Sequence, residues 1–189
     1  MNKSVKLNPH DAVAYFNLGN TEKELGRLEE AEASYKKAIT IKADFTEAYN
    51  NLGLVFKEQG RLEEAIATLR QAIMSKPDYA EAHFSIANIE NELSRLGEAE
   101  AGYNKAIELK PANSIYYLGR GSSKNKLKDY YGAIADYNKG IELKPDKAVL
   151  YYNRGLTKYS VGIDGCNDLV RAKELGGNVP AEAMKAICN

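Results

Sequence analysis

The chain has 189 residues, of which 44% are hydrophobic and 28% charged, so its length fits one folded domain or at most two. Twenty-six basic side chains balance twenty-six acidic ones, which disfavours nucleic acid or a membrane surface as a partner. No stretch reaches the roughly eighteen apolar residues of a membrane span. The two cysteines, Cys166 and Cys188, are too few for a disulfide framework, which favours reduced thiols and a cytoplasmic location.

Small residues recur along the chain at a fixed interval of 34 positions. One series is Gly19, Gly53, Ala87, Gly121 and Gly155, and a second is Ala31, Ala65, Ala99 and Ala133. Bulky residues recur at the same interval, at Tyr35, Leu69, Tyr103 and Tyr137. A sequence period of this length is typical of a repeat protein. The small residues indicate helices that approach closely, with the bulky ones filling the space between them.

Helix-breaking residues divide each repeat. Prolines or a substitute end the repeats, at Pro9, Ala43, Pro77, Pro111 and Pro145. Glycines interrupt three of them near the middle, at Gly26, Gly60 and Gly162. Each repeat is therefore predicted to be a helix, a turn and a second helix. The predicted bounds are 12–45, 46–79, 80–113, 114–147 and 148–176.

The two ends of the chain depart from this pattern. Residues 1–11 are expected to form the tail of a preceding repeat or an N-terminal lead-in. In the last repeat Ala172 comes two positions early, which predicts a shortened or distorted turn. Residues 177–189 predict a C-terminal capping helix that starts after Pro180 and carries Met184 and Ile187 on one face.

Two segments, YFNLGNTEKELGRLEEAEASYKKAI and YNNLGLVFKEQGRLEEAIATLRQAI, with three weaker copies, resemble the tetratricopeptide repeat (TPR) family. The resemblance covers nearly the whole chain, as about five repeats. It implies an all-α fold, a right-handed α-solenoid of stacked antiparallel helix pairs. It also implies that the first helix of each pair lines a concave groove in which ligands usually lie.

The groove positions of this sequence are polar in the first half of the chain and apolar in the second. Asparagine side chains suit the main chain of an extended peptide because they both donate and accept hydrogen bonds. Exposed apolar residues usually indicate a partner, although some of these could pack against neighbouring helices. We expect the partner-binding groove to include Phe16, Asn17, Asn20, Asn50, Asn51, Phe84, Asn88, Leu118, Tyr152, Leu156 and Tyr159, with Ile115 and Val149 extending the apolar stretch.

Arginine replaces leucine or isoleucine at one packed position of the last two repeats. In the first three repeats the residue before the recurring glycine or alanine is Leu18, Leu52 or Ile86. In the last two repeats it is Arg120 or Arg154. A charge at a helix interface needs a partner, since an unpaired one is costly. We therefore predict stabilising pairs of Arg120 with Asp136 and of Arg154 with Asp168, with no part in binding.

The resemblance implies a non-enzymatic scaffold that binds a peptide or helix of a partner protein. No catalytic, cofactor or metal site is expected, because the only histidines, His10 and His83, lack catalytic partners in the sequence. Binding of a terminal carboxylate is disfavoured, since Glu81 stands at a position that the corresponding TPR sub-class uses for it. Two alternatives stay open: a self-assembling, homo-oligomeric structural module, and an auxiliary domain of a larger enzyme.

Overall fold

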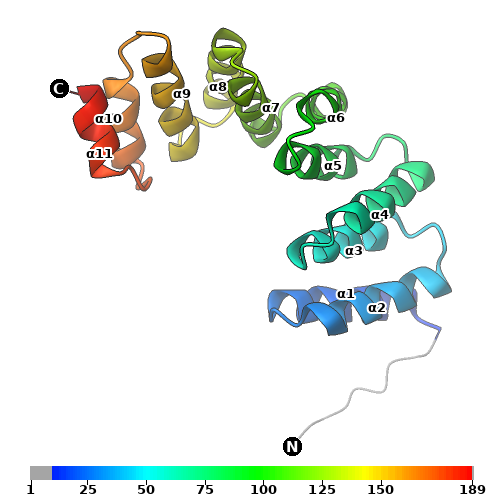
Figure 1. Ribbon diagram of the computed structural model, residues 1–189. Helices are drawn as coiled ribbons and strands as arrows, with labels where there is room; N and C mark the ends of the chain where they lie inside the picture. Colours follow the sequence, from blue (N-terminus) through cyan, green and yellow to red (C-terminus); the bar gives the residue numbers. More distant parts are fainter. Residues whose placement is uncertain (1–9, 189) are drawn as a thin grey trace, which may run out of the picture. The chain divides into compact units, whose positions relative to one another are not determined.

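The computed structural model describes residues 10–188, so the lead-in predicted for residues 1–11 falls almost wholly outside it. Within the described range the chain forms eleven α-helices and no strand, which confirms the predicted all-α class (Figure 1). Contacts divide the chain into an N-terminal unit, Met1–Ile89, and a C-terminal unit, Glu90–Asn189.

The N-terminal unit is built of helices joined by short turns. They are α1 (Ala12–Glu24), α2 (Leu28–Ile41), α3 (Thr46–Glu58), α4 (Leu62–Ser75) and most of α5 (Ala80–Glu92), whose residues 90–92 belong to the C-terminal unit. Helix α1 packs on α2, α2 on α3, and α3 on α4. Each of the helices α2, α3 and α4 therefore packs on the one before it, as in a stack of helix pairs.

The C-terminal unit has the same kind of helix-on-helix arrangement within itself and ends in a shorter helix. It contains α6 (Leu96–Leu109), α7 (Ser114–Lys126), α8 (Tyr130–Leu143), α9 (Ala148–Ser160), α10 (Cys166–Glu174) and α11 (Ala181–Cys188). Contacts join α6 to α7, α7 to α8, α8 to α9 and α9 to α10. Helix α11 contacts α10 and α9 but buries none of its residues fully. The repeat bounds that the sequence suggests stay predictions.

Glycine permits the close contact inside four of the helix pairs, at Gly19, Gly53, Gly121 and Gly155. A Cβ atom at Gly19 would lie 2.8 Å from the ring of Tyr35, and one at Gly121 would lie 2.7 Å from the ring of Tyr137. Both tyrosines are almost completely buried. The small and bulky series of the sequence therefore fit against each other, as predicted, because a larger residue at the glycine would push the facing ring away.

The turn inside each helix pair contains a residue with a positive φ angle. Gly26 and Gly60 take this conformation at 72° and 77°, and Ser94 and Lys128 take it at 59° and 63° at the equivalent positions. Arg27 N–H donates to the Glu22 carbonyl oxygen, as in the Schellman motif that ends many helices. The turn geometry is thus kept in repeats where glycine is absent from this position.

The predicted ion pairs are confirmed. Arg120 Nε donates to Asp136 Oδ2 at 2.9 Å, and Arg154 Nε donates to Asp168 Oδ2 at 3.0 Å. Lys158 Nζ lies 2.8 Å from Asp168 Oδ2. Although burial favours protonation, the hydrogen bonds from Arg154 and Lys158 hold the pKa of Asp168 below its ordinary value. These charges are accommodated between helices because each has its partner.

The last helix pair is distorted, as the early position of Ala172 suggests. Residues 161–165 separate α9 from α10, and α10 has only 9 residues where α8 has 14. Gly165 is the N-cap residue of this shortened helix, and a Cβ atom there would clash with the Gly155 carbonyl oxygen. The turn is therefore longer rather than shorter, and it replaces the first part of the second helix.

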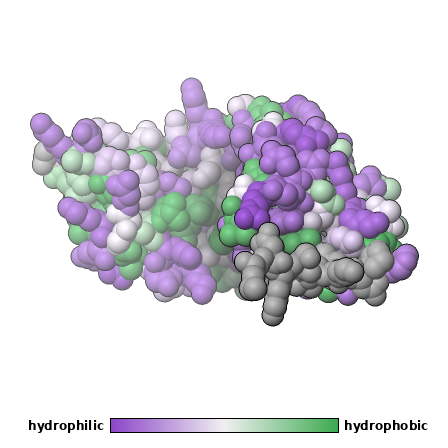
Figure 2. Space-filling model, turned by 90° about the horizontal axis from the view of Figure 1, so that it is seen from below, coloured by the Kyte–Doolittle hydropathy of each residue, from purple (hydrophilic) through white to green (hydrophobic). Residues whose placement is uncertain are grey.

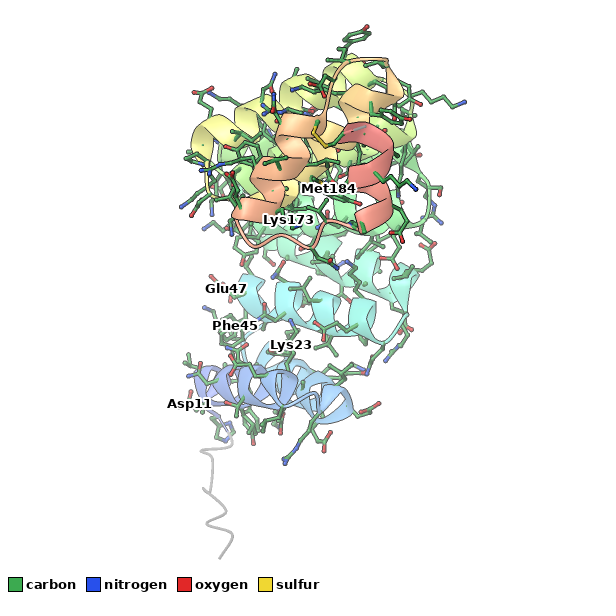
Figure 3. The ribbon with its side chains drawn as sticks, turned by 90° about the vertical axis from the view of Figure 1, so that its left-hand side faces the viewer. Asp11, Lys23, Phe45, Glu47, Lys173 and Met184 are labelled. Carbon is green, nitrogen blue, oxygen red and sulfur yellow. A yellow bond between two sulfur atoms is a disulfide. The ribbon has the colours of Figure 1, made fainter. Side chains whose placement is uncertain are left out.

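The prediction of reduced thiols is wrong. Cys166, at the start of α10, and Cys188, at the end of α11, form a disulfide (Figure 3). The two Cα atoms are 4.9 Å apart, since α11 folds back beside α10, and this brings residues 22 positions apart within bonding reach. Because disulfides persist mainly in oxidising compartments, the cytoplasmic location loses the support it drew from the cysteines and stays a prediction.

Candidate partner-binding surfaces

A polar hollow of about 410 Å³ lies on the first helices of the N-terminal unit. We call it the amide hollow; it is lined by Asn20, Lys23, Glu24, Tyr35, Asn51 and Glu58. The Tyr35 hydroxyl donates to Asn20 Oδ1 at 2.7 Å, and Asn51 Nδ2 donates to the same oxygen at 2.8 Å. Burial, with nearby glutamates, raises the pKa of Tyr35 to about 12, so its hydroxyl stays a donor at neutral pH.

Other polar groups around the amide hollow also bond to one another. Asn50 Nδ2 donates to Asn51 Oδ1 at 3.2 Å, and Lys23 Nζ lies 3.2 Å from Glu58 Oε1. The Asn50 side chain is buried, and its Oδ1 has no partner among the described residues. The asparagines of α1 and α3 therefore form an internal network that uses much of their hydrogen-bonding capacity.

The C-terminal unit has a hollow at the equivalent place, 102 positions later in the sequence. We call it the lysine hollow; it is lined by Ser122, Asn125, Lys126, Tyr137, Asn153 and Leu156. Ser122 replaces Asn20, and its hydroxyl lies 3.5 Å from that of Tyr137. Asn125 Nδ2 donates to Thr157 Oγ1 at 2.7 Å. The side-chain amide of Asn153, in contrast, has no partner among residues 10–188.

An apolar hollow of about 200 Å³ also lies between α7 and α9. It is lined by Ser114, Ile115, Leu118, Lys147, Val149 and Leu150, and we call it the apolar hollow. Ile115 is 47% exposed and Val149 is 44% exposed. A neighbouring hollow shares Val149 and adds Tyr152 and the loop residues Gly177 and Asn178. The face of α7 and α9 thus offers apolar side chains at one end and polar ones at the other.

The predicted groove residues separate into three sets. Five of them line the hollows described above, namely Asn20, Asn51, Leu118, Tyr152 and Leu156. Phe16 instead packs on the rings of Tyr35 and Phe45, with centroids 5.9 and 4.9 Å apart. The others are the buried Asn50, the exposed Asn17 and Tyr159, and the half-buried Phe84 and Asn88 on α5.

Sequence reasoning missed several residues of these hollows. Tyr35 and Tyr137 were expected only as packing residues, yet their hydroxyl groups face the two polar hollows. Lys126 and Lys147 line the hollows of the C-terminal unit without being candidates. The 34-residue interval carried the signal for the tyrosines, because each lies at a fixed offset from an asparagine or serine on the facing helix.

The N-terminal unit has a further hollow, of about 530 Å³, between its second helices α2 and α4. Leu52 and Phe56 lie at its floor but are only 5% and 4% exposed. The Arg61 guanidinium lies 4.1 Å from the centre of the Phe56 ring and covers it further. Leu52 and Phe56 of this hollow are therefore far less exposed than Ile115 and Val149 of the apolar hollow.

The described residues offer little to other kinds of site. The ring of His83 bonds to the Pro77 carbonyl oxygen at 3.0 Å. No group of three or more metal-binding side chains gathers in residues 10–188, and no helix there is both long and apolar enough to cross a membrane. On the face drawn in Figure 2 hydrophilic residues predominate, and apolar ones form small, separate patches.

Comparisons with solved structures place the fold among known repeat proteins. The match to a crystal structure of MamA protein covers 89% of this chain and 98% of the MamA chain, with a TM-score of 0.75 and 21% identity. The match to MamA from Desulfovibrio magneticus RS-1 covers 87% of this chain and 94% of that one, with a TM-score of 0.78 and 16% identity. The match to YrrB, described as a TPR protein with an unusual peptide-binding site, covers 92% of this chain and 90% of the YrrB chain, with a TM-score of 0.70 and 21% identity.

Family models give the same result from the sequence. A model described as TPR repeat matches residues 19–60 and 121–162, and two described as tetratricopeptide repeat match residues 50–114 and 1–33. No curated protein sequence matches the chain. The chain therefore belongs to the tetratricopeptide repeat family, has the helical solenoid fold of that family, and is of a kind that generally serves as a protein-interaction scaffold.

Proposed function

We propose that the chain is a non-enzymatic scaffold that binds a segment of a partner protein on the face of α7 and α9. The observation that carries the proposal is the combination of exposed Ile115 and Val149 with the amide of Asn153, which has no partner among the described residues. Apolar groups supply the affinity of most interfaces, and a few placed polar groups orient the ligand. The lysine hollow and the apolar hollow provide both on the same two helices.

The amide hollow of the N-terminal unit fits this role less well. Its asparagines bond to each other and to Tyr35, so a ligand must compete with existing hydrogen bonds. The side chain that would extend its apolar surface, Phe16, packs on Phe45 instead.

The comparison with YrrB supports the proposal, because YrrB is a TPR protein of similar fold that is described as having a peptide-binding site.

Selection from a display library of short random peptides tests the proposal. The full chain serves as bait, and each selected peptide is measured against the wild type and against the double variant Ile115→Ser/Val149→Ser. Both side chains are nearly half exposed, so the double variant is expected to fold normally, which circular dichroism checks. The matched control is Tyr131→Ser, since Tyr131 is 69% exposed and lies on α8.

Binding that is lost in the double variant and kept in Tyr131→Ser supports the proposed face. We expect a roughly thirtyfold loss, because each of the two apolar side chains that a ligand buries contributes on the order of 1 kcal/mol. If the selected peptides bind both variants as well as the wild type, the proposed face is wrong. A mass that rises with concentration, without any selected peptide, would favour the self-assembling module instead.

A further inference from the structure

We infer that the segment bound by the C-terminal unit is extended and acidic, with an apolar residue beside one carboxylate and a second carboxylate about five residues away. The inference rests on the proposed function and adds the chemistry of the partner. It follows from two lysines, one hollow for an apolar side chain and one unpaired amide, all of which line the same face of α7 and α9.

Within the part of the chain that the structure describes, the two lysines of this face have no acidic partner. Lys126 Nζ donates to the Asn91 carbonyl oxygen at 2.9 Å, and among residues 10–188 it pairs with no carboxylate. Lys147, at the apolar hollow, has no ion pair among these residues either. Other lysines of the same unit do have one, such as Lys139 with Glu142 and Lys158 with Asp168. The face therefore has positive charge that a ligand could neutralise.

The equivalent place in the N-terminal unit has the opposite charge. Glu24 lines the amide hollow at the position that Lys126 takes in the lysine hollow. Glu58 lines the amide hollow as well, where it pairs with Lys23. A segment with carboxylates would be repelled by Glu24 and attracted by Lys126. Charge complementarity thus directs an acidic ligand to the C-terminal unit.

The free amide of Asn153 favours an extended ligand over a helical one. A side-chain amide donates and accepts one hydrogen bond at a time with a peptide unit whose own groups are unpaired. The main-chain groups of an extended segment are unpaired, whereas those inside a helix bond to each other. The unpaired amide of Asn153 would therefore bond to the main chain of an extended ligand.

The spacing of the ligand follows from the geometry of α7. Ile115, at the apolar hollow, and Lys126, at the lysine hollow, are eleven positions apart on this helix. At about 1.5 Å per residue this spans roughly 16 Å, which about five residues of extended chain cover. Lys147 lies at the apolar hollow itself, so the carboxylate that it binds would stand beside the apolar residue.

Two synthetic peptides test this chemistry. Both are acetylated and amidated, which removes their terminal charges, and both contain leucine in a polar glycine- and serine-rich segment. In the first, one glutamate is next to the leucine and another is five residues away. In the second, glutamine replaces both glutamates. Fluorescence anisotropy measures the affinity of each for the full-length wild type, for Lys126→Met and for Lys173→Met, an exposed lysine on α10 that lines none of these hollows (Figure 3).

We expect the glutamate peptide to bind about fivefold more tightly than the glutamine peptide at low salt, since an exposed ion pair contributes at most about 1 kcal/mol. Lys126→Met should remove about half of this difference in free energy, and Lys173→Met none of it. The advantage should also shrink as salt is added. Such a pattern would assign the acidic specificity to Lys126 rather than to overall charge.

Two negative results are distinguishable. The acidic inference is wrong if the glutamate and glutamine peptides bind equally well, or if library peptides without acidic residues bind as tightly as the glutamate peptide. The proposed binding face stands in that case provided that these peptides lose affinity in Ile115→Ser/Val149→Ser. If neither designed peptide binds and no library peptide depends on Ile115 and Val149, the proposed function itself is wrong. Equal loss of affinity in Lys126→Met and Lys173→Met would also overturn the inference, because it would indicate a non-specific charge effect.

Discussion

The amide hollow and the lysine hollow occupy equivalent places in two repeats, yet they differ in what they leave available to a ligand. Each has a buried tyrosine at its floor, Tyr35 in one and Tyr137 in the other. In the amide hollow Asn20 accepts hydrogen bonds from both Tyr35 and Asn51. In the lysine hollow Ser122 is too short to repeat this arrangement, and within the described part of the chain the amide of Asn153 has no partner.

The difference shows that the same residue type can be bonded to its neighbours in one repeat and, among the described residues, keep an unbonded side-chain amide in another. An asparagine whose amide is already bonded to its neighbours stabilises the helix stack, while an unbonded one at a hollow is free for a ligand. The residue across the helix interface decides between the two roles. Four exchanges or perturbations test how far the two units differ, and they follow in order of expected effect.

The ion pairs of the C-terminal unit should be the most sensitive feature. Repeat 2 has Leu52 and Thr68 where repeat 4 has Arg120 and Asp136. We predict that Asp136→Thr lowers the free energy of unfolding by about 3 to 5 kcal/mol, because it leaves the half-buried Arg120 without its partner. The double variant Arg120→Leu/Asp136→Thr should recover most of this loss. Urea unfolding, followed by circular dichroism, measures these free energies. Equal free energies of unfolding for the single and the double variant would contradict the pairing.

The disulfide should stabilise only one end of the molecule. Reduction, or the variant Cys166→Ser/Cys188→Ser, should cost about 3 kcal/mol of local stability, since the bond closes a loop of 22 residues in the unfolded chain. Met184 lies on the side of α11 next to α10 (Figure 3), and this contact alone should hold α11 weakly. Amide hydrogen exchange should rise in α10 and α11 and stay unchanged in α1 to α4. An unchanged rate of amide hydrogen exchange in α11 would contradict this stabilising role of the disulfide.

The exchange Ser122→Asn should convert the lysine hollow to the pattern of the amide hollow. The new side chain would accept from Tyr137 and Asn153, as Asn20 accepts from Tyr35 and Asn51. We predict about 1 kcal/mol of added stability and a fewfold loss of peptide affinity. Thermal unfolding and anisotropy measure the two effects. The reverse exchange, Asn20→Ser, should lower stability by about 1 kcal/mol without a change in affinity.

A small acid-dependent difference should separate the two units. The pKa of Asp168 is lower in the folded chain than its ordinary value near 3.8, because hydrogen bonds from Arg154 and Lys158 outweigh burial. The stability that it contributes is therefore present above that ordinary value and is lost as the pH falls through the lowered one. We predict that the loss of stability caused by Asp168→Asn shrinks below about pH 4. Unfolding curves of the wild type and of Asp168→Asn at several pH values measure this difference in stability. A difference that stays the same at all pH values would contradict the ion pair.

Much of the fold follows from the sequence, because the repeat interval relates local patterns to packing. The fit of Gly19 against Tyr35 and the pair of Arg120 with Asp136 both follow from residues at fixed offsets. The conformation of Ser94 and Lys128 could not be read from residue type, since glycine usually marks a positive φ angle. Only the repeat interval indicates this conformation, because Ser94 and Lys128 lie 34 and 68 positions after Gly60.

The candidate surfaces were less predictable. Whether the amide of Asn51 or of Asn153 has a partner depends on which side chains of the neighbouring helix lie within hydrogen-bonding reach, and a list of groove positions does not give these distances. The disulfide was missed because it depends on how α11 folds back on α10, and two cysteines 22 positions apart give no spacing signal of their own. Phe16 packs on Phe45, the N-cap residue of α3, and its groove position alone does not predict this contact.

The most direct test of the binding face is a nuclear magnetic resonance titration of the isotope-labelled full chain with a peptide selected from the library. The side-chain amide signals of Asn153 and Asn51 are assigned by single substitution and followed as peptide is added. The signals of Asn153 should shift with the occupancy of the site, and those of Asn51, bonded to Asn20, should stay in place. Shifts at Asn51 with none at Asn153 would contradict the assignment of binding to the C-terminal unit.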